Sequence, residues 1–227
     1  MVLGAREGRF GKRGEKRSMQ PFAASSIPLV TLGTFLLWFG WFGFNGFSQL
    51  AMGTFDDVNA ISKIAVNTHL AGAAGTVTGA ALTRLIGGKT DIIMMLNGAL
   101  AGLVAITAEP LTPGPITAMI IGSIGAVIMY YGTKMLENLG LDDVVGAIPV
   151  HMFAGIFGTL VVPFTNSDTS FGTQFIGVIS VCVFSFALSW ITFSSLKSTV
   201  GLRISKAAEK QGTDKAEVGV IAYSIRD

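Results

Sequence analysis

Six long apolar runs alternate with short polar connections along this chain. The runs cover about residues 27–52, 64–86, 92–108, 114–135, 144–164 and 172–196. Each is close to the roughly 17–25 residues that a helix needs to cross the hydrocarbon core of a bilayer. Apolar and polar residues do not alternate within the runs, as they would in half-buried strands. The pattern therefore predicts an all-α, polytopic membrane helical bundle with about six transmembrane helices.

The predicted connections are rich in Gly, Pro, Asn and Asp, which favour turns. They cover residues 56–59, 87–91, 109–115, 138–143 and 165–168. With six spans, the N-terminal segment, the second and fourth connections and the C-terminal tail must lie on one side of the membrane.

The basic residues test this arrangement. All 16 Lys and Arg residues except Lys63 lie in the segments that share that side or at the ends of the spans next to them. Because cytoplasmic loops carry an excess of Lys and Arg, we expect both termini in the cytoplasm and a multi-pass protein in the cell membrane. We predict a basic cytoplasmic segment at 1–26, a six-helix transmembrane domain at 27–198 and a cytoplasmic tail at 199–227. The two end segments hold these basic residues: Arg6, Arg9, Lys12, Arg13, Lys16, Arg17, Arg203, Lys206, Lys210, Lys215 and Arg226.

Composition agrees with a membrane protein. Hydrophobic residues make up 50% of the chain, charged residues 13%, and the mean hydropathy is +0.60. Ordinary soluble domains carry about 25% charged residues. Residues 1–20 are basic without an apolar core, so we expect no cleavable signal peptide. They also lack interleaved aromatic residues, and we expect no nucleic-acid binding. The single cysteine, Cys182, supports neither a disulfide framework nor a metal site.

One ionisable side chain, His151, lies near the middle of the apolar stretch 147–160. A satisfied core histidine is the ordinary interpretation for a soluble helix. In a membrane span, an ionisable residue is costly unless it faces a protein interior or a cavity, and it usually marks a pathway or binding site. The predicted spans therefore make His151 the first candidate functional residue.

Few other polar groups suggest chemistry. The adjacent acids Asp142 and Asp143 precede the span that carries His151, and we expect them to cap that helix rather than to catalyse a reaction. Glu109 precedes Pro110 in a predicted outer connection and is interpreted as part of a solvated turn. No catalytic motif is present. We expect neither an enzyme nor a cofactor nor a metal site.

Aromatic residues crowd the first span between Trp38 and Phe47, interrupted by glycine. They could form an interfacial belt. A belt explains one end of a helix but not the eleven residues from Trp38 to Ser48, so we expect some rings to line a constriction. A hydrophobic constriction rejects hydrated ions, and an aromatic face attracts a cation.

Small residues recur at helical spacing inside the spans. Spacings of three or four residues place glycines on one helix face, where they let backbones approach closely. We therefore expect a compact bundle. The glycines are Gly72, Gly75, Gly79, Gly98, Gly102, Gly122, Gly125, Gly155 and Gly158.

Residues 37–46, Leu-Trp-Phe-Gly-Trp-Phe-Gly-Phe-Asn-Gly, resemble the signature of the ammonium transporter (Amt/Mep/Rh) family. Further matches follow in the family's order over essentially the whole chain. They are residues 66–68, 97–108, Asp142 and Asp143 with Val150 and His151, residues 155–160, residues 201–205, and Ala222 with Tyr223.

The resemblance implies a trimeric, channel-like transporter with one pore per subunit. Ammonium would be captured at an outer aromatic site and lose a proton, and ammonia would pass a hydrophobic pore that bears two histidines. By motif, Trp41 and Ser48 match the outer vestibule, Phe44 a gating phenylalanine, and His151 the second pore histidine. Structural or gating roles fall to Asn45, Asn67, Asp142 and Asp143.

The chain also departs from the family pattern. Members have about eleven spans, arranged as two inverted repeats of five and a final helix, an arrangement common among transporters. This sequence matches the second repeat and the final helix, so the expected fold is an ammonium-transporter-like half without the helix of the first pore histidine. His69 lies in a different helix and is interpreted as a packing or local polar residue. Val218 stands where the family usually has histidine in the tail.

Two functions from different classes stay open. The first is an ammonium or ammonia pathway, present as a C-terminal portion that does not transport alone. The second is a non-transporting membrane subunit, or an ammonium sensor or regulator, that associates with full-length transporters. The expected partners are ammonium or ammonia, the lipid bilayer, and either a homotrimer or a chain supplying the first repeat. A regulatory protein at the cytoplasmic tail is a further expected partner.

Overall fold

A computed structural model describes residues 2–11 and 22–222. Of the residues used above, Lys12, Arg13, Lys16, Arg17, Tyr223 and Arg226 lie outside the described residues. The chain divides into two compact units. Unit 1 contains residues 1–25, 136–142 and 180–227, and unit 2 contains residues 26–135 and 143–179. Each unit is described by itself.

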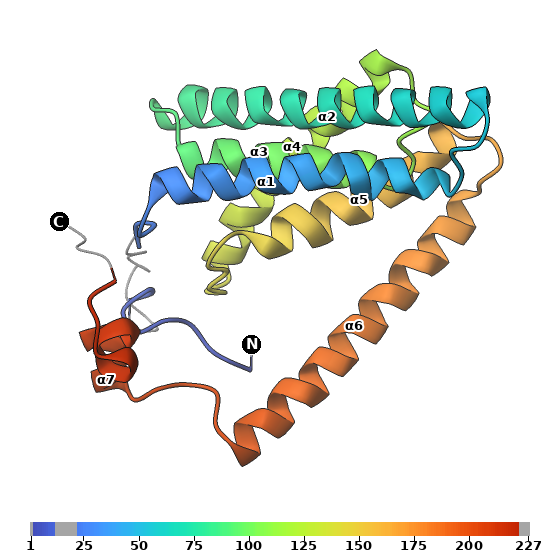
Figure 1. Cartoon of the computed structure of the whole chain (residues 1–227). Helices are drawn as coiled ribbons and strands as arrows, with labels where there is room; N and C mark the ends of the chain where they lie inside the picture. Colours follow the sequence, from blue (N-terminus) through green and yellow to red (C-terminus); the bar gives the residue numbers. More distant parts are fainter. Residues whose placement is uncertain (1, 12–21, 223–227) are drawn as a thin grey trace. The chain divides into compact units, whose positions relative to one another are not determined.

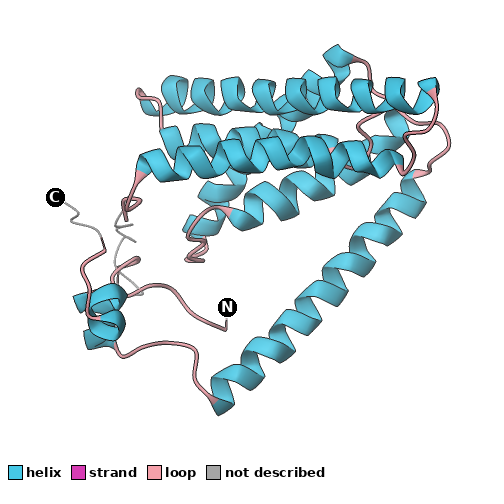
Figure 2. Ribbon diagram, viewed as in Figure 1, coloured by secondary structure: helices cyan, strands magenta, loops and turns pink. Residues whose placement is uncertain are grey.

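Every regular element of the described residues is helical, which confirms the predicted all-α class (Figure 2). The longer helices are α1 (Ile27–Gly46), α2 (Phe55–Gly87), α3 (Ile92–Ile106), α4 (Pro115–Asn138), α5 (Ala154–Val161), α6 (Phe171–Thr199) and α7 (Lys206–Gln211) (Figure 1). The short elements are the 3-10 helices η1 (Phe47–Gln49) and η3 (Val162–Phe164) and the π-helices η2 (Ile148–Phe153) and η4 (Asp214–Val218).

The six predicted runs all fall on helices. By length and composition, three of the described helices could cross a membrane: Ile27–Gln49, Pro115–Asn138 and Phe171–Thr199. The runs at 92–108 and 144–164 form the shorter apolar helices Ile92–Ile106 and Ile148–Phe164. The run at 64–86 belongs to α2, which is 33 residues long and carries acidic residues in its first turn.

The predicted turn at 56–59 is wrong, because α2 already begins at Phe55. The Thr54 hydroxyl accepts a hydrogen bond from the Asp57 amide, and the Asp57 carboxylate accepts one from the Thr54 amide. This reciprocal capping box satisfies amides that the first helical turn leaves without partners. Acidic residues that suggest a turn in the sequence therefore start a helix.

Glycines bring the helices of unit 2 into backbone contact, as their spacing predicted. A Cβ atom added to Gly125 of α4 would lie 2.8 Å from the carbonyl oxygen of Ala101 in α3. The same addition at Gly79 of α2 would lie 2.9 Å from the carbonyl oxygen of Met94. Such contacts leave no room for a side chain, and dispersion over closely packed backbones stabilises helix pairs in lipid.

Helix α3 is the most enclosed element of unit 2. It packs against α1, α2, α5 and η2, and Leu103 and Ala101 are fully buried. Leu103 belongs to a core cluster with Met129 and Val150, against which Trp38 and Trp41 of α1 pack. The core of unit 2 thus lies beneath the aromatic stretch of α1.

In unit 1, an ion-pair network joins the N-terminal segment to the end of α4. The guanidinium of Arg6 donates to both carboxylate oxygens of Asp142 at 2.8 Å, and the Arg6 backbone amide donates to the same carboxylate at 2.9 Å. Arg9 pairs with Glu137 at 2.7 Å. The bonds from Arg6 lower the pKa of Asp142, whose side chain is only 3% exposed.

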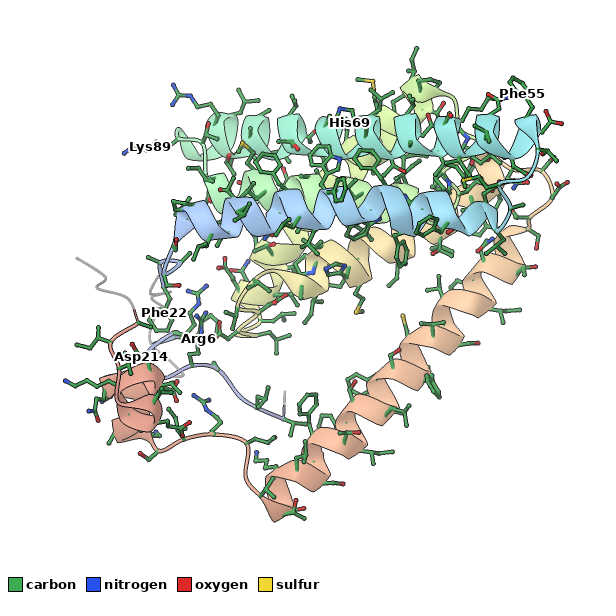
Figure 3. The ribbon with its side chains drawn as sticks, viewed as in Figure 1. Arg6, Phe22, Phe55, His69, Lys89 and Asp214 are labelled. Carbon is green, nitrogen blue, oxygen red and sulfur yellow. The ribbon has the colours of Figure 1, made fainter. Side chains whose placement is uncertain are left out.

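The same N-terminal segment contacts the tail (Figure 3). The Glu7 amide donates to the Glu209 carboxylate at 2.8 Å, and Arg203 donates to the Ala5 carbonyl at 2.6 Å. Arg203 also pairs with Glu209. The described parts of both end segments therefore lie together in unit 1.

Candidate functional site

The aromatic stretch of α1 contacts two different histidines. Trp38 and Trp41 are three residues apart, so they share a helix face and pack against the same core cluster. Trp41 and Phe44 lie together, with ring centroids 6.0 Å apart. Trp38 and Phe42 contact His69 of α2. By their ring contacts, the aromatic residues therefore form two clusters, each with its own histidine.

The first cluster joins Trp41, Phe44 and His151. The Trp41 and His151 rings are stacked, with centroids 6.5 Å apart and planes inclined by 13°. The side chains of Phe44 and His151 are exposed in this chain, whereas Trp41 is half-buried. Three of the four predicted pathway residues thus share one surface of unit 2.

Trp41 is held by α3. Its indole N–H donates to the Thr107 hydroxyl at 2.7 Å, and that hydroxyl donates to the Leu103 carbonyl at 2.7 Å. A buried indole usually needs such a partner for its N–H. The ring therefore has a defined orientation against His151.

A π-helical segment carries His151. The Ala154 amide bonds to the Pro149 carbonyl, which gives the wide turn of η2. Single π-helical turns are rare and frequently mark functional sites. Pro149 and Val150 are buried, while His151, next along the chain, is exposed. The segment directs the imidazole away from the core.

The two adjacent acids have different partners, so the capping prediction is right for Asp143 only. The Asp143 carboxylate accepts hydrogen bonds from the amides of Ala147 and Ile148 at 3.0 and 2.8 Å. Asp142 instead binds Arg6 in unit 1. Side chains of successive residues point in different directions, and each acid binds the donors within its reach.

Asn45 lies at the C-terminal end of α1, Ser48 follows it in η1, and Asn67 lies on α2. Ser48, the fourth pathway residue, is exposed, and its hydroxyl donates to the Phe44 carbonyl at 3.1 Å. Asn45 is fully buried and donates to the Thr68 hydroxyl at 2.9 Å. Asn67 donates to the carbonyls of Pro110 and Pro113. The two asparagines fasten α1 to α2, and α2 to the α3–α4 connection.

The second cluster lies between α1 and α2. His69 lies on α2 (Figure 3). It contacts Trp38 with ring centroids 5.5 Å apart and Phe42 with ring centroids 6.2 Å apart. These ring contacts agree with its interpretation as a local packing residue, although its side chain is exposed. The structure does not bring His69 into the first cluster.

Sequence reasoning missed three residues around this site: Thr107, Glu109 and Asn166. Glu109 was expected in a solvated turn, yet its carboxylate accepts bonds from the amides of Leu111 and Thr112 and from the Asn166 side chain. In the sequence, Thr107 and Glu109 stand out only as polar residues that follow the last residue of α3. Their partners lie far along the chain, so spacing could not reveal them.

The first cluster can do simple chemistry. Its aromatic faces can attract a small cation, and its imidazole can accept or donate a hydrogen bond. No group of three or more His, Cys, Asp or Glu residues in the described part of the chain could hold a metal ion.

Comparison with known proteins decides the family. The model of the Ammonium Transporter Family matches residues 1–223. This chain belongs to the ammonium transporter family. Its helices are accordingly those of a polytopic membrane bundle, as the sequence predicted, and its relatives are transporters, not enzymes.

Several curated ammonium transporters are similar to this chain. The ammonium transporter Amt2 of Archaeoglobus fulgidus is 39% identical, over 98% of this chain and 50% of the relative. A putative ammonium transporter of Synechocystis sp. is 37% identical, over 96% of this chain and 40% of the relative. The chain thus spans about half the length of the curated relatives it matches.

Solved structures show the same fold. A Sensor Amt Protein is similar with a TM-score of 0.86 and 33% identity, covering 95% of this chain and 54% of that chain. A mutant of Candida albicans Mep2 is similar with a TM-score of 0.76 and 26% identity, covering 96% of this chain and 50% of that chain. The helical arrangement of this chain is therefore found in Amt and Mep proteins.

Proposed function

We propose that this chain forms one wall of a pathway for ammonium and ammonia through a membrane. The observation that carries the proposal is the exposed cluster of Trp41, Phe44 and His151 in a chain of the ammonium transporter family. Trp41 and Ser48 take part in capture, Phe44 gates the pathway, and His151 lies within it. Asn45, Asn67, Asp142 and Asp143 hold the surrounding elements.

The chemistry of these side chains suits that task. Moving a bare ammonium ion into an apolar pore is costly, because its hydration is lost without compensation. An aromatic face attracts the cation. The His151 imidazole accepts or relays the proton. Neutral ammonia then crosses the apolar part at a much lower free-energy cost.

The pathway needs a second wall. Phe44 is 66% exposed and His151 is also exposed in this chain. Both residues would face lipid unless another surface covered them, and an ionisable group facing hydrocarbon is unfavourable. We infer that the chain does not transport alone and associates with a chain that supplies the first repeat, in a homotrimer of such pores.

We infer the membrane topology of the chain from its positive charges. The contacts of Glu7 and Ala5 with the tail support a common side for both end segments. The excess of basic residues on the corresponding segments favours the cytoplasm, and the membrane is the cell membrane. A regulatory protein could then bind the exposed tail.

Uptake of labelled methylammonium tests this proposal. In cells lacking their own ammonium transporters, residues 1–227 alone should give no uptake above background. Co-expression with the N-terminal half of the Archaeoglobus fulgidus relative should give uptake that His151→Ala abolishes and His69→Ala preserves. Uptake by the chain alone would contradict the need for a second wall. Uptake that survives His151→Ala would contradict the pathway.

A second candidate function is a sensor or regulator that binds ammonium and associates with full-length transporters. The favouring observation is the 0.86 TM-score to a Sensor Amt Protein. A sensor would change its Trp41 fluorescence with ammonium, and the co-expressed pair would show no uptake. A transport pathway predicts saturable uptake in that same pair.

A further inference from the structure

Hydrogen bonds from its own backbone, from Asn166 and from Asn67 hold the connection between α3 and α4. Oε1 of Glu109 accepts hydrogen bonds from the amides of Leu111 and Thr112, both at 3.1 Å. Oε2 of Glu109 accepts one from the Asn166 side chain at 2.8 Å. Asn67 of α2 donates to two carbonyls of the same connection. The Glu109 carboxylate therefore closes its own turn and joins it to a segment 57 residues away.

Asn166 is itself fixed. Its amide donates to the Val162 carbonyl at 2.9 Å, and its side-chain oxygen accepts from the Asp168 amide at 2.9 Å. The side-chain nitrogen is thus left to point at Glu109. Asn166 lies just after η3, which ends the helical segment Ile148–Phe164 that carries His151.

The bond between Glu109 and Asn166 extends a contact between two helices. Along the helices, Gly158 of α5 lies against the backbone of Ala105 in α3, so close that no Cβ atom fits between them. Such a glycine contact sets the distance between the helices. A charge-assisted hydrogen bond beyond the helix ends adds a second fixed point between the same two segments.

We propose that Glu109 is a positioning residue for the Trp41–His151 pair, and the inference rests on the proposed function. Thr107, two residues before Glu109, accepts the indole N–H of Trp41. His151 lies on the segment that leads to Asn166. By joining Glu109 to Asn166, the carboxylate holds the Trp41 acceptor and the His151 segment in register. It does not touch the substrate.

The carboxylate and the carboxamide can be exchanged between positions 109 and 166. Glutamine at position 109 keeps one oxygen for the Leu111 and Thr112 amides, but it turns the second oxygen into a donor that faces the Asn166 donor. Aspartate at position 166 places a second carboxylate against Glu109. Glu109→Gln combined with Asn166→Asp restores donor and acceptor with reversed polarity. Each single change breaks the bond, and the pair of changes rebuilds it.

Tryptophan fluorescence reads the positioning directly, because a histidine side chain beside an indole quenches its emission. In the full chain carrying Trp38→Phe and Trp190→Phe, Trp41 is the remaining tryptophan, and His151 should quench its emission. His151→Ala should remove this quenching. Glu109→Gln and Asn166→Asp should each cut its amplitude by half or more, and the exchanged pair should restore it. Asp168→Asn, in the same connection as Asn166, should leave it unchanged.

Uptake by the co-expressed pair of half-chains provides the second readout. Glu109→Gln should lower the maximal rate roughly 10-fold, since small misplacements of reacting groups cost up to about 100-fold, while KM stays within about 2-fold. The exchanged pair should recover the rate. Recovery in the exchanged pair would show that the bond between positions 109 and 166 carries the effect, whichever side chain supplies the carboxylate.

The outcomes separate the two ideas. Single variants that match the wild-type chain in quenching, or an exchanged pair no better than the single variants, would overturn the positioning role of Glu109. Restored quenching in the exchanged pair, in a chain whose co-expressed form transports nothing, would support the positioning role and contradict the transport function. Normal transport in every Glu109 variant would support the transport function and contradict the positioning role.

Discussion

The imidazole of His151 lies parallel to the indole of Trp41, with centroids 6.5 Å apart and planes inclined by 13°. The two residues are 110 positions apart and come from different helices, so their contact depends on the packing of α1 and η2 around α3. Thr107 and Leu103 of α3 fix the indole from the other side. The geometry of the Trp41–His151 pair therefore depends on three helical elements, α1, α3 and η2.

Thr107→Val should leave the indole N–H of Trp41 without a partner inside the bundle. An unsatisfied buried donor costs about 1–3 kcal/mol, and we expect the free energy of unfolding in detergent to fall by that amount. Thr107→Ser retains the hydroxyl and should stay close to wild type. A loss of stability in Thr107→Ser with none in Thr107→Val would show that the methyl group, not the hydrogen bond, is the important part.

Asn67→Ala should loosen the α3–α4 connection. The change leaves the carbonyls of Pro110 and Pro113 without their donor, again at a cost of about 1–3 kcal/mol. Hydrogen exchange at the Leu111 and Thr112 amides should become faster. Asn59→Ala, at an exposed position of the same helix, is the matched control. Faster exchange of the Leu111 and Thr112 amides in this control variant would argue against a local effect of Asn67.

Gly122→Ala should be strongly unfavourable. A Cβ atom at Gly122 of α4 would collide with the Ala71 backbone in α2, and overpacking typically costs about 1–3 kcal/mol. Gly40→Ala adds the same atom where nothing lies within 4 Å and should be nearly neutral or stabilising, because alanine favours helix. Thermal unfolding in detergent separates the two. Similar melting temperatures would mean that the helices relax apart easily.

Acid should release the N-terminal segment from Asp142. The bonds from Arg6 lower the pKa of Asp142 in the folded chain. This contribution to stability is therefore complete above the unfolded pKa, near 3.9 for aspartate, and is lost as pH falls through the lower folded pKa. Between pH 7 and 5, Asp142→Asn should reduce the free energy of unfolding by about 1–3 kcal/mol.

The difference between Asp142→Asn and wild type should shrink once the pH falls below about 4. Asp168→Asn removes a carboxylate from another connection and should follow the wild-type curve throughout. A constant difference between Asp142→Asn and wild type over the whole range would show that the charge of Asp142 is not its contribution.

Much of the architecture could be predicted from residue patterns alone. Run length and lack of alternation were enough for helices, because a chain in lipid must satisfy its backbone hydrogen bonds within each segment. Glycine spacing indicated close backbone approach, and Gly125 against Ala101 bears this out. Residues 37–46 carried the family resemblance because the motif is contiguous. The domain boundaries at 26 and 198 and the pathway roles remain predictions.

Helix boundaries were less accessible. Asp57 resembles a turn residue in the sequence but completes a capping box with Thr54, so α2 starts earlier than its apolar run. A cap depends on the local φ and ψ angles and on one side-chain rotamer, which hydropathy does not report.

The sequence by itself determined the helices, their apolar character, the family, and which side chains were candidates for chemistry. Tertiary structure alone decided which partners those side chains have. It separated Trp41 with His151 from Trp38 with His69, sent Asp142 to Arg6 while Asp143 capped η2, and turned Glu109 from a supposed solvated turn into a bond with Asn166. The physical reason is range: helix formation depends on neighbours within a few residues, whereas these contacts depend on the packing of segments far apart in the chain.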